Sequence, residues 1–101
     1  MLDLRPNCEN CGKDLPNSSI EAMICTFECT FCAECVKTVL QNVCPNCGGG
    51  FEKRPSRPTE CFTPNCIQNY PASTVRKVKP VNKDAFAPLQ QHFLKIDPRK
   101  R

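Results

Sequence analysis

The chain has little of what a membrane segment or a common enzyme site requires. Its 101 residues include no tryptophan and one histidine. No stretch approaches the 18 or more apolar residues of a membrane-spanning helix, so we expect no membrane contact. The histidine, His92, is far in sequence from any obvious nucleophile, and we expect it to be an exposed side chain. With Cys61 and Cys66 it would supply only three metal ligands.

A secretory signal is also missing from the first residues, which lack a basic start, an apolar run and a small-residue cleavage site. Small secreted domains are often rich in disulfides, whereas thiols in the cytosol stay reduced. We therefore expect a cytoplasmic protein whose cysteines bind metal. A disulfide framework is the alternative.

What the sequence does have is ten cysteines, eight of which form four close pairs. Three pairs have the spacing C-x2-C and one has C-x3-C. Two residues between cysteines let one tight turn offer two sulfur atoms to a zinc ion, which takes four ligands in a tetrahedron at about 2.3 Å. The sequence therefore predicts two closed four-thiolate zinc sites, made by Cys8 and Cys11, Cys25 and Cys29, Cys32 and Cys35, and Cys44 and Cys47.

Metal binding would also compensate for a small core. The large apolar residues within residues 1–53 are too few for a self-sufficient core in a unit of this size. Structural zinc contributes roughly 10 to 16 kcal/mol in small zinc-finger peptides, where binding and folding are one event. We therefore expect a small metal-stabilised α+β domain that is largely unfolded without its two zinc ions.

Charge and composition divide the chain into residues 1–53 and a tail, residues 54–101. Residues 1–50 carry three Lys and Arg against six Asp and Glu, a net charge of −3, whereas residues 51–101 carry eleven against four, a net charge of +7. Residues 54–58 predict a basic, extended linker, because each proline moves the preceding residue out of the helical region. Five further prolines exclude any long regular element, so we expect a largely extended tail.

Three short elements are expected. Apolar residues between the third and fourth cysteine pairs recur with the spacing of one helical face, which predicts a helix from Ala33 to Gln41. In the tail, residues 74–79 indicate a short basic edge strand. Pro88 at a first helical position predicts a short amphipathic helix over residues 88–96, which we expect to dock on its own domain rather than on a partner.

A five-residue repeat marks the first and last cysteine pairs, because residues 8–12 and residues 44–48 both follow the pattern C-x-N-C-G. We call these segments the first and second knuckles. Asparagine tolerates and glycine permits a left-handed backbone, so the amides that follow can turn back and donate hydrogen bonds to the sulfur atoms.

The order of the ligands, C-x2-C-x13-C-x3-C-x2-C-x2-C-x8-C-x2-C, resembles the RING finger, with Cys29 where a histidine most often stands. The resemblance implies a cross-brace with one central helix and a minimal β-hairpin. Its alternating pairs would place Cys8, Cys11, Cys32 and Cys35 at site 1, and Cys25, Cys29, Cys44 and Cys47 at site 2. In the alternative arrangement the two knuckles share one ion and the middle four cysteines share the other. We expect Phe27 and Phe31 to pack between the sites.

Longer stretches resemble a bacterial family of small, eight-cysteine proteins classed as a domain of unknown function. They are LRPNCE at residues 4–9, ICTFECTFCAEC at residues 24–35 and CPNCGG at residues 44–49. The resemblance covers roughly residues 1–80. It supports zinc binding and implies no particular activity.

The expected function is that of a non-enzymatic zinc-binding module that contacts another protein. Four protein ligands at each site leave no open position for water or substrate, which catalytic zinc needs. A RING ubiquitin ligase is disfavoured, because Asn10 stands where an aliphatic contact residue is usual and Gly48 where a basic residue would assist transfer. No tryptophan is present for the helix position that contacts the conjugating enzyme.

Two alternatives stay open. The basic tail could bind nucleic acid through phosphate contacts made by Arg76, Lys77, Lys79, Lys83 and residues 99–101, with Phe62 or Tyr70 stacking on bases. The protein could instead be a redox or zinc sensor, since oxidation of thiolates in closed zinc sites releases the metal. Cys61 and Cys66 are left over from the two sites, and we expect them to be free or loosely paired thiols.

Overall fold

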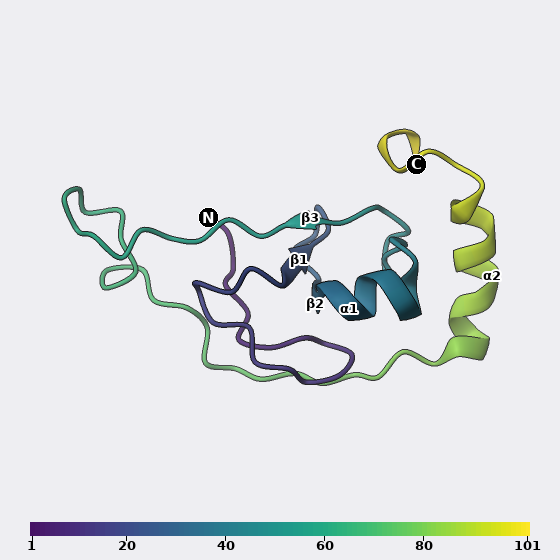
Figure 1. The fold of residues 1–101 in the computed structure, drawn as a ribbon, viewed down its shortest axis with the longest axis horizontal. Coiled ribbons are helices and arrows are strands. Elements are labelled where there is room, and N and C mark those ends of the chain that lie inside the picture. The colour runs from purple at the N-terminus through teal and green to yellow at the C-terminus, as the bar shows by residue number, and fades with distance from the viewer.

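Three short antiparallel strands form the centre of the molecule, which a computed structural model describes over residues 1–101 (Figure 1). They are β1 (Ala22–Ile24), β2 (Thr30–Cys32) and β3 (Glu52–Lys53), arranged in the order β2-β1-β3. Strands β1 and β2 form a hairpin, and β3 then adds to the other edge of β1. The chain is thus a small α+β protein, elongated to 46 × 27 × 18 Å.

A single coil of helix follows β2 directly. It begins as α1 (Ala33–Cys35) and continues as the wider π-helical turn η1 (Val36–Leu40), so a helix lies where the sequence predicts one. At its start the Cys32 sulfur accepts a hydrogen bond from the backbone N–H of Cys35. At its end Gln41 and Asn42 take a left-handed backbone, with φ of 50° and 61°, which stops the helix before the second knuckle.

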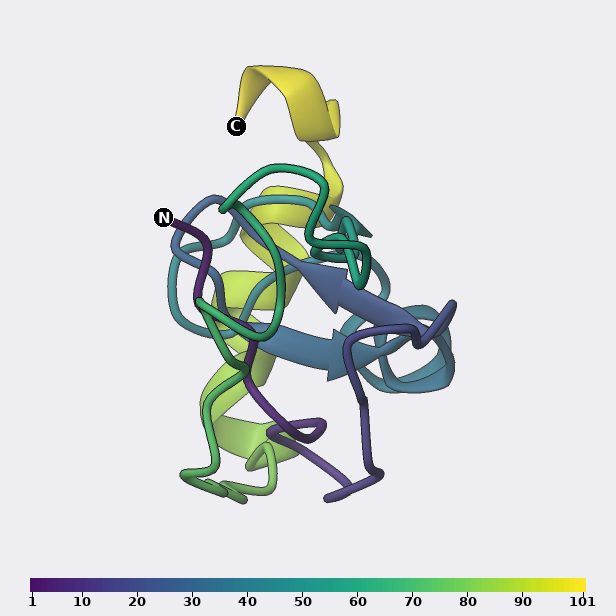
Figure 2. The same cartoon turned by 90° about the vertical axis from the view of Figure 1, so that its left-hand side faces the viewer.

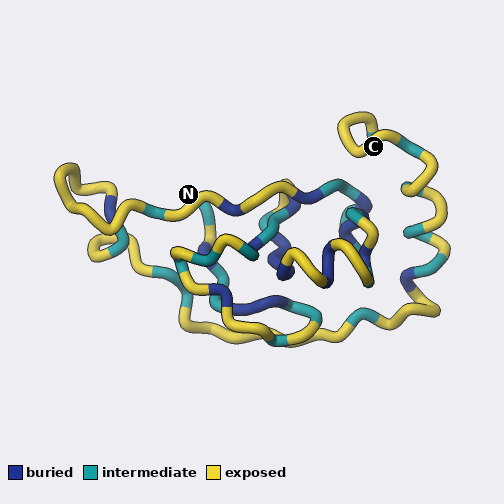
Figure 3. Tube along the Cα trace, in the orientation of Figure 1, coloured by how far each residue is buried: buried dark blue, intermediate teal, exposed yellow.

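The core lies between this helix and the sheet (Figure 3). Phe31 and Phe51 meet there edge to face, with ring centroids 5.5 Å apart. Phe31 is therefore buried as expected, but the expectation for Phe27 is wrong, because 72% of its surface is exposed. Phe27 lies in the tight turn between β1 and β2, which Glu28 closes by donating its backbone N–H to Cys25, and Phe51 fills the space beside Phe31.

Residues 54–58 form no free linker. Arg54 is 6% exposed and its guanidinium donates to the carbonyls of Arg5, Leu15 and Pro16. Arg57 donates to the carbonyls of Leu2 and Tyr70. The two arginines thus attach the start of the tail to the N-terminal part of the chain.

Beyond this point a loop projects from one end of the molecule, at the left of Figure 1. It contains a disulfide between Cys61 and Cys66, so these two cysteines are bonded and are not the free or loosely paired thiols that we expected. Phe62, in the same loop, is 99% exposed.

Residues 73–81, which we call the strap, then return along the N-terminal segment. The predicted strand at residues 74–79 does not form. Instead, separate contacts occur along the strap. Ser73 and Lys79 donate backbone N–H groups to the carbonyls of Leu4 and Glu9, and Asn7 donates its side-chain amide to the carbonyl of Lys77. These contacts run parallel to residues 4–10 without the continuous ladder of a strand.

The tail ends in helix α2 (Lys83–Leu94), followed by the short 3-10 turn η2 (Pro98–Lys100). The helix starts five residues before the predicted 88–96, because the side chain of Asn82 caps it by accepting from the N–H groups of Asp84 and Ala85. Pro88 therefore lies inside the helix and not at its start, and the expectation that the prolines exclude a long regular element in the tail is wrong, because α2 has 12 residues.

Helix α2 docks on its own domain, as expected. Phe86 is buried in the common core, and Leu89 and Phe93 pack against it. Gln90 donates its side-chain amide to the carbonyls of Val39 and Leu40 at the end of η1. Figure 2 shows α2 behind the sheet, on the side away from the projecting loop. His92 is exposed on this helix, and no helix of the chain has the length and apolar character to cross a membrane.

Candidate metal centre

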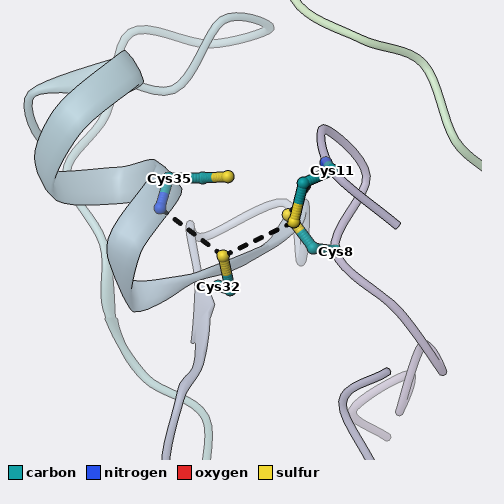
Figure 4. Close-up of side chains that lie close together, drawn as sticks. All are labelled: Cys8, Cys11, Cys32 and Cys35. Carbon is teal, nitrogen blue, oxygen red and sulfur yellow. Dashed lines mark hydrogen bonds between the residues drawn. The ribbon is translucent and has the colours of Figure 1, made fainter. Parts of the chain in front are cut away.

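Four sulfur atoms converge where the first knuckle meets the start of the helix (Figure 4). They belong to Cys8, Cys11, Cys32 and Cys35, and all lie within 4.8 Å of one another. The sulfur atoms of Cys11 and Cys32 are 3.8 Å apart. A tetrahedron with metal–sulfur bonds of about 2.3 Å has edges of about 3.8 Å, so this spacing suits a four-thiolate site.

The first knuckle brings Cys8 and Cys11 to this site through a closed turn. Cys8 donates its N–H to the carbonyl of Lys13 at 2.8 Å, and Gly12 donates to the carbonyl of Cys8 at 3.0 Å. Gly12 has a φ of 80°, a conformation that costs a residue with a Cβ about 1 to 2 kcal/mol. The N–H of Cys11 is then directed at the sulfur of Cys8, 3.5 Å away.

The second knuckle repeats this geometry. Cys44 donates to the carbonyl of Gly49 at 2.8 Å, Gly48 donates to the carbonyl of Cys44 at 2.8 Å, and Gly48 has a φ of 79°. The sulfur atoms of Cys44 and Cys47 lie within 4.8 Å of each other and of the Cys25 sulfur, which forms a second cluster.

The fourth expected ligand of this cluster, Cys29, lies beside it but outside the 4.8 Å group. Its sulfur accepts a hydrogen bond from the side-chain amide of Asn46 in the second knuckle, at 3.3 Å. Burial raises the pKa of the Cys29 thiol, and hydrogen bonding to Cys25 and Cys44 is among the further influences on it. Cys29 is thus hydrogen-bonded to the second knuckle but is not one of the three sulfur atoms that converge there.

The two clusters divide the cysteines in the interleaved order. The first pair joins the third, and Cys25 of the second pair joins the fourth, while Cys29 contacts the second knuckle through Asn46. The two knuckles belong to different clusters, so they do not share one site as the alternative arrangement requires. Either cluster can hold a metal ion.

Both knuckle asparagines have a role that sequence reasoning missed. Neither Asn10 nor Asn46 takes a left-handed backbone, a conformation that the glycines supply alone. Asn10 instead donates its side-chain amide to the sulfur of Cys35, as Asn46 does to Cys29, at 3.3 Å in each case. The shared C-x-N-C-G pattern was a signal for these bonds, because the same amide recurs two residues after the first cysteine.

Burial dominates the titration of the sulfur atoms. It raises the pKa of the thiols of Cys32, Cys35 and Cys44. At Cys8 burial acts in the same direction, but the backbone N–H groups of Cys11, Cys32 and Asn10 outweigh it and lower the pKa. In the metal-free cluster a first negative charge is therefore favoured at Cys8, while burial, followed by repulsion from that charge, disfavours ionisation of Cys32 and Cys35.

The comparison with known proteins rests on this cysteine-rich part of the chain. The model of a family described as "Protein of unknown function (DUF1272)" matches residues 1–57, which contain both clusters and all three strands. The chain belongs to this family. An uncharacterized protein of Rhizobium meliloti (strain 1021) is 58% identical over 80 residues, which is 79% of this chain and 89% of the relative. No solved structure matches.

Membership in DUF1272 agrees with the resemblance to a bacterial family of unknown function drawn from the sequence. The matched region ends at residue 57, at the start of the projecting loop. The 80 residues shared with the relative are more than the family match covers, so that likeness includes residues outside residues 1–57.

Proposed function

We propose that this DUF1272 protein is a non-enzymatic interaction module built on two structural zinc ions in a RING-like cross-brace. Site 1 would consist of Cys8, Cys11, Cys32 and Cys35, and site 2 of Cys25, Cys29, Cys44 and Cys47. The observation that carries the proposal is the convergence of four sulfur atoms within 4.8 Å, with a sulfur–sulfur distance of 3.8 Å.

The donor set favours zinc and a structural role. Four thiolates in a tetrahedral arrangement suit zinc or an iron–sulfur centre, and a structural zinc site is closed by four protein ligands. With all four positions taken by cysteines, no position is left for water or a substrate, so we propose that neither ion is catalytic. The eight ligands must stay reduced to bind zinc, which favours the cytoplasm, whereas the Cys61–Cys66 disulfide is of a kind that is rare in that compartment.

A protein partner is the proposed target of the module. The exposed aromatic side chains Phe27 and Phe62 lie in two separate turns, and aromatic residues commonly anchor protein interfaces. Nucleic-acid binding by the tail stays an alternative prediction. Arg76, one of the residues proposed to contact phosphate, is paired with Asp14 and the carbonyl of Gly12.

Native mass spectrometry of the full-length protein tests the proposal through the number of bound ions. We expect two zinc ions per chain, and one fewer in Cys11→Ser and in Cys47→Ser because each variant removes one ligand. Cys61→Ser is the matched control, since it removes a cysteine outside both clusters and should leave two ions. A wild-type protein without zinc, or a Cys61→Ser variant that loses an ion, would contradict the assignment.

A further inference from the structure

The strap lies directly on the first knuckle. Arg76 donates to the carbonyl of Gly12 at 2.7 Å and pairs with Asp14. Lys79 donates its backbone N–H to the carbonyl of Glu9 at 2.7 Å. The strap therefore contacts main-chain atoms whose positions depend on the turn that carries Cys8 and Cys11.

One hydrogen-bond chain continues from the strap to a ligand sulfur. The N–H of Val81 donates to the side-chain oxygen of Asn10 at 2.9 Å, and the nitrogen of the same amide donates to the sulfur of Cys35 at 3.3 Å. A single asparagine side chain thus links the tail to site 1.

Helix α2 covers the second knuckle in a corresponding way. The ring of Phe93 lies so close to Gly48 that a methyl group at this glycine would overlap it. Past the helix, Arg101 donates to the carbonyl of Asn42 at 2.6 Å and lies 3.5 Å from that of Gly48. Phe93 and Arg101 in the tail therefore pack closely against the backbone in and beside the second knuckle.

A pocket open to solvent lies along the contact between tail and domain. Its volume is about 240 Å³, and it is lined in part by Glu9, Phe31, Asn46, Lys79, Val81 and Phe86. Charge supports docking, because residues 73–94 carry four Lys and Arg against one Asp, a net charge of +3, and residues 1–50 carry −3 before the thiolates are counted. Four thiolates around a divalent ion would add two negative charges at each site. Docking is thus favoured by electrostatics, and the open pocket interrupts the apolar contact.

We propose that the strap and α2 together, residues 73–94, form a latch whose docking is coupled to metal occupancy. Loss of the ion at site 1 would release the first knuckle, which contains Gly12, and the strap would undock from it. Loss of the ion at site 2 would release the second knuckle, which contains Gly48, and α2 would undock from it. Because such coupling is reciprocal, the docked latch must strengthen metal binding by the same factor. The inference rests on the proposed zinc sites and adds that the tail regulates them.

The test compares zinc loss from full-length variants that weaken the latch without touching a ligand. Phe93→Ala removes the cover of the second knuckle, and Leu94→Ala is its control because Leu94 is 44% exposed on the same helix. Arg76→Ala removes the contact with Gly12. Lys77→Ala is its control, since it removes the same charge from an exposed neighbouring side chain.

Each zinc-loaded protein is mixed with excess chromogenic chelator, and newly freed thiols are alkylated during the reaction and mapped by peptide mass. We expect Phe93→Ala to accelerate alkylation of Cys44 and Cys47, and Arg76→Ala that of Cys8 and Cys11. An increase of about tenfold corresponds to an activation barrier for zinc loss that is ~1.4 kcal/mol lower. The controls should release zinc at the wild-type rate.

Metal stoichiometry, measured first, separates the two proposals. If the wild-type protein holds no zinc, the proposed function fails and the latch fails with it. If all five proteins hold two ions and lose them at one rate, the zinc sites stand and the latch is overturned. Hydrogen exchange gives an independent readout, because undocking should expose the amides of Lys79 and Val81 in Arg76→Ala while both ions stay bound.

Discussion

At the scale of single residues, asparagine side chains hydrogen-bond to the cysteine sulfur atoms that are the proposed metal ligands. Asn10 and Asn46 occupy the same place in the two knuckles and each donates to a sulfur of another cysteine pair. Such bonds stabilise a thiolate and orient it for the metal. They tie each knuckle to a ligand that the other half of the site contributes.

Asn46→Ala is expected to weaken zinc binding by about 10- to 100-fold, the usual effect of removing a group that supports a metal ligand. Asn10→Ala should weaken zinc binding further, because the Asn10 side chain also accepts a hydrogen bond from the backbone N–H of Val81 in the strap. Competition with a chelator of known affinity measures both effects. Asn65→Ala, in the exposed projecting loop, is the control and should bind zinc as the wild type does.

The two knuckle glycines should differ in their tolerance of alanine. Both have φ near 80°, so each substitution costs about 1 to 2 kcal/mol of backbone strain. At Gly12 the nearest atom to a new methyl group is Val78 Cγ2 at 3.4 Å, whereas at Gly48 the methyl group overlaps the Phe93 ring. Gly48→Ala should therefore reduce the free energy of unfolding of the zinc-loaded protein more than Gly12→Ala.

Denaturant unfolding of a double mutant isolates the cause of this difference. In a Phe93→Ala background the overlap disappears. Gly48→Ala should then reduce the free energy of unfolding no more than Gly12→Ala does. An unchanged difference in that background would show that Phe93 is not its source.

At the scale of elements, one buried arginine joins three segments that the sequence separates. Arg54 follows β3 and donates to the carbonyls of Arg5, Leu15 and Pro16, with no carboxylate bonded to it. Burial lowers the pKa of Arg54, but its guanidinium stays charged at neutral pH. Three charge-assisted hydrogen bonds replace the hydration that burial removes.

Arg54→Ala should reduce the free energy of unfolding by about 2 to 4 kcal/mol, because three carbonyls lose their partner. The midpoint of denaturant unfolding of the zinc-loaded protein measures this loss. Lys53→Ala, at the exposed neighbouring position, should shift the midpoint little. Equal effects of the two substitutions would contradict a structural role for Arg54.

Helix α2 carries a defect at its middle. Pro88 cannot donate to the carbonyl of Asp84, so the helix lacks one internal hydrogen bond. Pro88→Ala should restore it and stabilise the helix by about 1 to 2 kcal/mol, less than the full interior cost of proline because the helix already accommodates the ring. Slower hydrogen exchange within residues 83–94 is the expected result, with Pro98→Ala, outside the helix, as the control.

At the scale of the whole molecule, folding and metal binding depend on pH together. In the folded chain burial raises the pKa of four thiols, those of Cys29, Cys32, Cys35 and Cys44, and the usual thiol pKa of an unfolded chain also lies above neutral pH, so without metal these thiols are protonated in either state. Zinc must displace these protons when it binds. Apparent zinc affinity should therefore rise with pH, by about tenfold per pH unit for each proton displaced, and fall on acidification.

Zinc titrations between about pH 6 and pH 8, below the usual thiol pKa, check this dependence. Circular dichroism on the same samples should show the fold disappearing as zinc is lost, because the apolar core is small. An affinity that does not change with pH would mean that the thiols are already ionised in the metal-free protein.

Particular elements show how far sequence reasoning extends. The helix between the third and fourth cysteine pairs was predictable because its apolar residues recur with the spacing of one buried helical face. The hairpin was implied by the resemblance to the RING finger. The burial of Phe27 and the first residue of α2 were predicted wrongly for the same reason. Whether an aromatic residue turns inward, or Asn82 caps a helix, depends on neighbours that the chain brings together only on folding.

The amino-acid sequence by itself determined the family, the pairing of eight cysteines by local spacing and the glycines that each knuckle turn requires. These are local properties, fixed by covalent reach over a few residues. Only the tertiary structure decided the grouping of the pairs into two clusters, the Cys61–Cys66 bond and the docking of the tail over both knuckles. Those outcomes depend on contacts between residues as far as 71 positions apart, such as Val81 and Asn10, which no local pattern encodes.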